Sequence, residues 1–227
     1  MKKIAGIAIL FIIIAAVAFV WKFPYAEYVE KAVRELNSGK DVNISWAGSE
    51  NKFPNVIFKD VSVSTSQGSA AEFDTLKVQG GICGDLKFDG KGKDDFTLNG
   101  TMKNGNINFN IKNYRLPSYI ASMSGEGSFN FNGNYNIRTK QGLINFTGTI
   151  LKIPHSVINI PVSLTGKADI NGDQTDISFD ASGDKIKGTG NAVIKGKAID
   201  GKVRIDTGII PINVKISGEV DSIKIKV

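Results

Sequence analysis

The side chains that most often carry out chemistry are scarce in this chain of 227 residues. It contains one histidine, His155, and one cysteine, Cys83. General acid–base catalysis would therefore fall to carboxylates, and these are scattered in turns such as Asp94-Asp95. Because no nucleophile, base and orienting acid can be grouped from this inventory, we expect that the protein is not an enzyme.

The same scarcity limits redox and metal chemistry. A lone Cys83 cannot form an intramolecular disulfide, and we interpret it as a small buried apolar residue. One cysteine and one histidine also cannot build the usual transition-metal shells. The run Asp169-x-Asn171-Gly172-Asp173 partly resembles a calcium loop, but it lacks the later glutamate, and the turn of a hairpin explains it better. We expect no metal site and no cofactor.

The net charge of +6 raises the question of an anionic partner. The lysines are spread along the predicted strands, as in Lys185-x-Lys187, Lys195-x-Lys197 and Lys224-x-Lys226, and they form no dense basic arm. We therefore expect no nucleic-acid partner. Two interpretations of these lysines stay open: a solvated outer face that protects strand edges from aggregation, or attraction to anionic lipid head groups.

The first element that positions the chain is an apolar segment at residues 4–21, which contains no charged side chain. Its length is close to the roughly 20 residues that cross a bilayer core. Lys2 and Lys3 precede the segment, so residues 1–3 are predicted to lie in the cytoplasm and the remainder of the chain to be exported. The residues that typify this anchor are Ile4, Leu10, Phe11, Ile14, Phe19 and Trp21.

A secretory signal peptide is the alternative interpretation of this segment. Ala16-Val17-Ala18 fits a small-residue cleavage site, which would leave a mature chain beginning at Phe19. The apolar run continues past that point and ends at Trp21, an aromatic typical of the membrane interface. We therefore favour an uncleaved, single-pass anchor.

Residues 22–39 predict a short amphipathic helix. Pro24 suits a first helical turn and Gly39 suits a C-cap. Apolar residues recur between them at helical spacing, with charged residues on the other face. The helix is expected either to close the open end of the following domain or to lie on the membrane surface.

Residues 40–227 predict a mainly β domain, an antiparallel sheet of many strands separated by Gly, Asn, Asp and Ser. Apolar and polar residues alternate strictly, so that each strand has one apolar face. We expect these faces to line one continuous apolar channel. Its predicted lining residues are Ile107, Phe109, Ile111, Phe129, Phe131, Ile144, Phe146, Ile177 and Phe179.

Whether that apolar face is open or sealed is not decided by the alternation. A closed sandwich or barrel would bury such a face against itself. The domain is rich in asparagine, however, and it has no tryptophan after Trp46. We favour a long, curled sheet that forms an open groove, because the chain has few apolar residues left over to cover it.

At this level the chain resembles the AsmA-like group of inner-membrane-anchored periplasmic proteins, and most closely the type II secretion protein N (GspN-like) branch. The resemblance lies in the order of the segments: an apolar anchor, an amphipathic helix and then alternating strands. It also includes glycines that resemble the family's corners between strands. The segments that carry it are Phe23-Pro24, Val42-x-Ile44-x-Trp46, the run 53–63, the run 73–78, and the segments around Gly100, Gly125-Glu126-Gly127 and Gly166.

The resemblance implies a β-groove that shelters lipid tails, anchored in the cell inner membrane with most of the chain in the periplasm. It implies lipid transport or lipid binding, with phospholipid acyl chains and envelope proteins as partners and a homo-oligomer as an option. It implies no catalytic residue. The alternatives are a structural accessory of a type II secretion apparatus and a lipopolysaccharide-export component of the anchor-plus-jelly-roll type.

Overall fold

The structure is a computed structural model that describes residues 42–52, 55–65, 68–80, 85–115, 126–152, 161–184, 186–208, 211–219 and 222–226. The predicted anchor at residues 4–21 and the predicted amphipathic helix at residues 22–39 lie outside these ranges, as do Cys83 and His155. Within the described ranges, no helix has the length and apolar character needed to cross a membrane.

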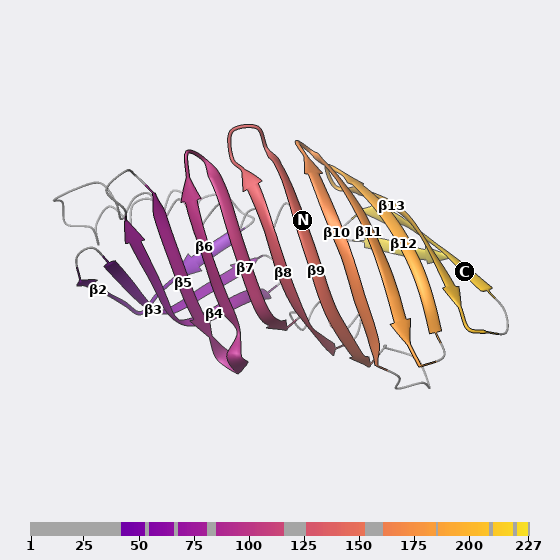
Figure 1. Cartoon of the computed structure of the whole chain (residues 1–227), viewed down its shortest axis with the longest axis horizontal. Coiled ribbons are helices and arrows are strands. Elements are labelled where there is room, and N and C mark those ends of the chain that lie inside the picture. Colours follow the sequence, from indigo (N-terminus) through magenta and orange to yellow (C-terminus); the bar gives the residue numbers. More distant parts are fainter. Residues whose placement is uncertain are drawn as a thin grey trace. The chain divides into compact units, whose positions relative to one another are not determined.

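The described chain is mainly β and antiparallel, which confirms the predicted fold class at this level (Figure 1). It divides into two compact units, which we call unit 1 (strands β1–β7) and unit 2 (strands β8–β15). The described strands do not return to pair with the first one, so the sheet is not closed.

Unit 1 has the strand order β1-β3-β4-β5-β6-β7, with β2 following β1 along the same edge of β3. A single turn of 3-10 helix, η1, lies between β5 and β6. The elements are β1 (Val42–Ser45), β2 (Gly48–Lys52), β3 (Asn55–Thr65), β4 (Gly68–Gly80), β5 (Leu86–Gly92), η1 (Lys93–Asp95), β6 (Thr97–Lys103) and β7 (Asn106–Arg115).

Unit 2 is a meander in which each strand pairs with the next one along the chain. Its strands are β8 (Glu126–Asn136), β9 (Gln141–Lys152), β10 (Val162–Asn171), β11 (Gln174–Gly183), β12 (Ile186–Lys195), β13 (Ala198–Asp206), β14 (Pro211–Glu219) and β15 (Ser222–Lys226).

Tight turns join many of these strands and fix their register. β6 and β7 are joined at Asn104-Gly105, both with positive φ, which is the signature of a hairpin turn that matches strand twist. β10 and β11 are joined at Gly172-Asp173, where Gly172 has φ +61°. The predicted hairpin at this run is therefore confirmed.

A bulge in β4 changes which residues face the core of unit 1. The register against β5 shifts between Phe73 and Thr75, so one extra residue, Asp74, is accommodated there. Phe73 and Leu76, three positions apart, are in consequence both buried, at 2% and 1% exposure. The strict two-residue alternation predicted from the sequence fails at this point because a bulge adds one residue to the count.

Candidate functional site

The candidate site is the apolar face of unit 2, where strand pairing sets apolar residues side by side. The predicted Phe131 pairs with Phe146, and Phe146 pairs with Gly166 on β10. Gly166 then pairs with the predicted Phe179, which pairs with Gly190 on β12. Antiparallel pairing of consecutive strands thus brings three of the predicted aromatic residues into one cross-strand row.

Three further rows run parallel to this one and contain, with the exception of Thr175, only apolar residues and glycine. We call the four rows together the apolar face of unit 2. The row next to the aromatic one contains Gly133, Ile144, Ala168, Ile177, Ala192, Gly201, Ile216 and Ile225. The row on the other side contains Phe129, Gly148, Leu164, Ala181, Gly188, Ile205 and Ile212. The third row contains Tyr135, Gly142, Ile170, Thr175, Ile194, Ile199, Gly218 and Ile223.

The structure therefore places all six predicted lining residues of unit 2 on one face. They differ in how far they are covered. Phe129 and Ile144 are buried, at 7% and 8% exposure. The other four are half-buried: Phe131, Phe146, Ile177 and Phe179.

Several aromatic rings on this face lie over a glycine of the neighbouring strand. A methyl group built on Gly190 would come within 2.3 Å of the Phe179 ring, and one on Gly148 within 2.3 Å of the Phe129 ring. Gly166 is overlain in the same way by Phe146, at 2.5 Å. The absence of a side chain at these positions lets the rings lie close to the backbone. The result is a face built of rings laid against the sheet.

This arrangement corrects one sequence-based interpretation. Gly100 and Gly166, interpreted as corners between strands, lie inside β6 and β10, and both have partners on each side. Gly127 likewise lies inside β8. The physical reason is steric: Gly100 and Gly166 make room for an aromatic ring from the next strand, so they mark packing positions and not breaks. Sequence reasoning missed this role, although a glycine opposite an aromatic residue in a meander is a usable signal.

The rings themselves form a contiguous group. The centroids of Phe129 and Phe131 are 6.1 Å apart, and those of Phe131 and Phe146 are 6.4 Å apart. Both distances fall within the range of favourable aromatic pairs. The half-buried Phe131 stands between the half-buried Phe146 ring and the buried Phe129 ring.

The three predicted lining residues of unit 1 have a different environment. Ile107 is fully buried and Phe109 is 6% exposed, whereas Ile111 is half-buried. They pair with Met102, Gly100 and Leu98, so they too share one face of their sheet. Their burial is that of a packed core. That the nine residues line one continuous channel stays a prediction, because the two units are described separately.

Part of the cover in unit 1 comes from an aromatic cluster at η1. Phe96, directly after η1, lies with its ring 4.9 Å from that of Phe73 on β4 and 5.5 Å from that of Tyr114 on β7. β4 and β7 are separated by β5 and β6 in the sheet. Phe96 therefore bridges residues from strands that do not pair, which is how a curled sheet brings two parts of one face together.

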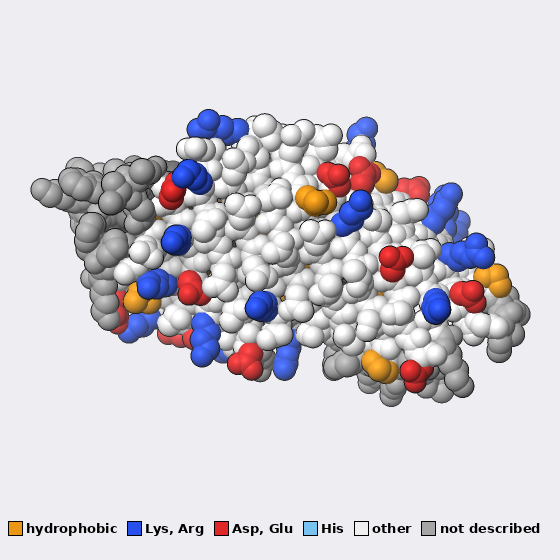
Figure 2. Space-filling model, in the orientation of Figure 1, with side chains coloured by type: hydrophobic (Ala, Val, Ile, Leu, Met, Phe, Trp, Pro, Cys, Tyr) orange, Lys and Arg blue, Asp and Glu red, His pale blue; other side chains and the backbone are white. Residues whose placement is uncertain are grey.

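The opposite face of unit 2 is polar, and we call it the polar face. Its strands present mainly Asn, Gln, Ser, Thr, Asp, Glu, Lys and Arg at alternate positions, and the exposed Leu143 (37%) and Val193 (41%) are among the apolar exceptions. Figure 2 shows one face of the molecule, on which hydrophobic side chains appear at only a few places. The clean separation into two faces is what the sequence alternation predicted.

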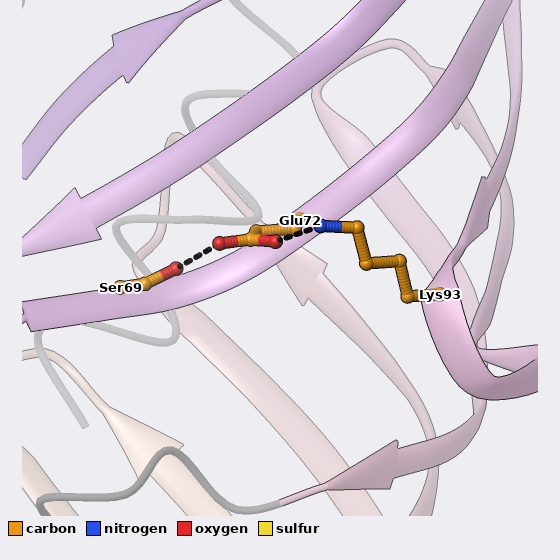
Figure 3. A network of polar contacts seen from close by, with 3 residues as sticks. All are labelled: Ser69, Glu72 and Lys93. Atoms are coloured by element: carbon orange, nitrogen blue, oxygen red, sulfur yellow. Dashed lines mark hydrogen bonds and ion pairs between the residues drawn. The ribbon is translucent and has the colours of Figure 1, made fainter.

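The ion pairs that the structure shows among the described residues lie on the surface. In unit 1, Lys93 donates to Glu72 at 2.9 Å, and the Ser69 hydroxyl donates to the same carboxylate at 3.3 Å (Figure 3). The Lys93 ammonium lowers the pKa of Glu72, and Glu72 raises the pKa of Lys93. Both side chains are well exposed, so this is a surface ion pair.

Within the described ranges, no group of three or more His, Cys, Asp or Glu side chains is arranged to hold a metal ion. The six residues that typify the predicted anchor lie outside those ranges.

Comparisons of the chain with protein-family models, with curated proteins and with solved structures found no match. The candidate site therefore has to be interpreted from its own residues.

Proposed function

We propose that this protein binds lipid acyl chains on the apolar face of unit 2 and holds or transfers phospholipid beside the membrane that anchors it. The observation that carries the proposal is the half-buried state of Phe131, Phe146 and Phe179 on the otherwise apolar face of a sheet that is not closed. A soluble chain rarely leaves a contiguous set of aromatic residues partly exposed unless they meet a partner.

An acyl chain is the occupant that best suits this face. It is flexible, it makes no hydrogen bonds, and the rows offer no polar side chain except Thr175 at 7% exposure. Each buried methylene contributes about 0.8 kcal/mol, so a dozen methylenes would be retained tightly. The rings over Gly148, Gly166 and Gly190 lie close to the sheet, so an acyl chain can lie flat across them.

The predicted anchor at residues 4–21 supports the same choice, since it would keep the domain next to a source of lipid. In this proposal the protein belongs to the AsmA-like, GspN-like proteins that it resembles, is a single-pass inner-membrane protein with a periplasmic domain, and uses no cofactor and no catalytic residue.

The test is photo-crosslinking of the full-length chain in cells. A photoreactive phenylalanine at Phe131 or Phe179 is expected to capture phospholipid, because both rings are half-buried on the apolar face. The matched control is the same photoreactive residue at Asn132, the neighbour of Phe131 that is exposed on the polar face and is expected to capture none. Mass spectrometry identifies the adducts.

A Phe131→Asp variant separates an open face from a sealed one. On an open face the charge keeps access to water, so the protein stays folded while capture at Phe179 falls. In a sealed core the same charge unfolds the domain. A folded protein that yields only protein adducts at both positions would refute lipid binding and favour the alternative, a structural accessory of a secretion apparatus.

A further inference from the structure

The polar face of unit 2 contains an open hollow near the C-terminal strands. Its volume is about 540 Å³, within the range of pockets that take small organic ligands. It is lined by residues of β12, β13, β14 and β15, and its charged lining is entirely basic: Lys202, Arg204, Lys215 and Lys226. We call it the cationic hollow. In Figure 2, Lys and Arg side chains are spread over the face that is shown and, at its C-terminal end, lie among Asp and Glu side chains.

Strand register sets three of these cations side by side. Lys202 on β13 pairs directly with Lys215 on β14, and Lys215 pairs directly with Lys226 on β15. Side chains that are directly opposite have Cβ atoms about 4.5–5.5 Å apart, and like charges in that position destabilise a sheet. Arg204 lies two residues along β13 from Lys202, on the same face. The chain thus maintains an unfavourable row of positive charge.

The neighbours of the row do little to offset it. Opposite Lys202 on β12 lies Asn191, and opposite Arg204 lie Thr189 and Asn213, all uncharged. The carboxylates on β13, Asp200 and Asp206, stand two residues beyond Lys202 and Arg204, about 6.6 Å along the strand. Among the described residues, the structure shows no ion pair or hydrogen bond for any of the four basic side chains.

Edge protection does not account for the whole arrangement. Lysines on an exposed edge strand discourage aggregation, and Lys226 lies on β15, which pairs on one side only. Lys202, Arg204 and Lys215 instead lie on β13 and β14, each of which has strand partners on both sides. Three of the four cations therefore need another explanation.

We propose that the cationic hollow binds a phosphate group, either free or as part of a lipid head group. A guanidinium offers paired donors to phosphate oxygens, and lysines add point charges. Thr189, Asn191 and Asn213 line the same hollow and supply uncharged hydrogen-bond donors. The site lies on the face opposite the apolar rows, so it does not depend on the proposed function.

The experiment uses the full-length chain in an uncharged detergent and measures binding by calorimetry. The two probes are inorganic phosphate and a short-chain phosphatidic acid, with the matching diacylglycerol as a blank. Lys215→Gln, which removes the middle cation of the row, is expected to weaken binding about tenfold. The matched control is Lys167→Gln, on the polar face at β10 and outside the hollow, which is expected to leave binding unchanged.

A second measurement guards against a folding defect. Without phosphate, Lys215→Gln should melt no lower than the unmodified chain, because it removes repulsion within the row. Binding of both probes, each weakened by Lys215→Gln alone, would support a site for phosphate from either source. If only one probe binds and Lys215→Gln alone weakens its binding, the site takes phosphate from the source that this probe represents, free phosphate or a lipid head group. No binding of either probe, or equal weakening by Lys215→Gln and Lys167→Gln, would overturn the proposal.

Discussion

Unit 1 and unit 2 are built from the same alternating strands, yet they cover their apolar faces to different extents. Ile107 of β7 in unit 1 is fully buried, whereas Ile177 of β11 in unit 2 is half-buried. Phe88 of unit 1 is 4% exposed, while Phe179 of unit 2 is half-buried. Equal alternation therefore does not produce equal burial.

The difference lies in the side-chain volume that is available to cover each face. Unit 1 adds large side chains from β3, β4 and the end of η1, among them Phe58, Phe73 and Phe96, each at most 8% exposed. The rows of unit 2 contain many glycines and alanines, such as Gly166, Gly190 and Ala192, which supply little or no side-chain volume. Small residues contribute little volume with which to cover the face, and half-buried apolar residues such as Ile177 and Phe179 remain on it.

The largest expected effect comes from truncating the two isoleucines. Ile107→Ala should lower the free energy of unfolding by about 3 kcal/mol, because it leaves a cavity in a packed core. Ile177→Ala should cost about 1 kcal/mol, since its side chain is only half-buried. Urea unfolding of the full-length chain in detergent, followed by circular dichroism, measures both.

Trp46 gives a local probe for this comparison, since its ring lies 5.6 Å from Phe58 within unit 1. The fluorescence of Trp46 should report the loss of unfolding free energy caused by Ile107→Ala. Equal costs for the two substitutions would mean that the apolar face of unit 2 is as fully packed as that of unit 1, and the lipid proposal would lose its main support.

A smaller effect is expected from adding a methyl group beneath a ring. In Gly100→Ala the new Cβ would lie 2.2 Å from Phe88 and 2.5 Å from the backbone oxygen of Asn108. Neither can move, because Phe88 is buried and Asn108 belongs to the ladder, so we expect a loss of about 2 kcal/mol. In Gly190→Ala the close atoms all belong to the Phe179 ring. That half-buried ring can turn away, and the loss should stay below about 1 kcal/mol.

Gly48→Ala is the control for both variants, because a Cβ at Gly48 meets nothing within 4 Å. The melting temperatures of the three full-length variants are compared, and Gly100→Ala is expected to melt lowest, followed by Gly190→Ala and then Gly48→Ala. If Gly190→Ala proved as costly as Gly100→Ala, Phe179 would have no space to turn into, which contradicts an open face.

Much of the fold followed from the sequence because a meander pairs neighbours in the chain. Alternation in segments such as Asn106–Ile111 fixes which residues share a face, and turn residues such as Gly172-Asp173 fix where a hairpin reverses. Once consecutive strands pair, Phe131, Phe146 and Phe179 must fall on one face. That part of the candidate site was therefore predictable.

The rest depends on residues that are distant in the sequence. The contact of Phe96 with Phe73 and Tyr114 arises from the curl of unit 1, which alternation does not encode. The bulge at Asp74 shifts the count by one residue without any Gly or Pro at that position. The row of Lys202, Lys215 and Lys226 requires the exact register of three strands, and a shift by one residue would disperse it.

The smallest expected effect concerns charge, where the two units should respond to salt with opposite signs. In unit 1, Lys93 attracts Glu72 across an exposed surface, so salt should weaken this contact slightly. In unit 2 the lysine row repels itself, so salt should relieve it. Salt should therefore destabilise the Glu72→Gln variant less than the unmodified chain. In the Lys215→Gln variant, salt should give a smaller stabilisation than in the unmodified chain. Melting curves at low and high sodium chloride measure both differences.

The same ion pair predicts a pH window for unit 1. The pKa of Glu72 is lowered from its ordinary 4.5, so its contribution is present above that value and is lost as the pH falls through the lowered pKa. The pKa of Lys93 is raised from 10.5, so its contribution is present below that value and is lost as the pH rises through the raised pKa. Glu72→Gln should therefore destabilise the chain slightly at neutral pH and leave it unchanged at acid pH well below the lowered pKa. A difference from the unmodified chain that persisted under those acid conditions would show that Glu72 acts by packing and not by charge.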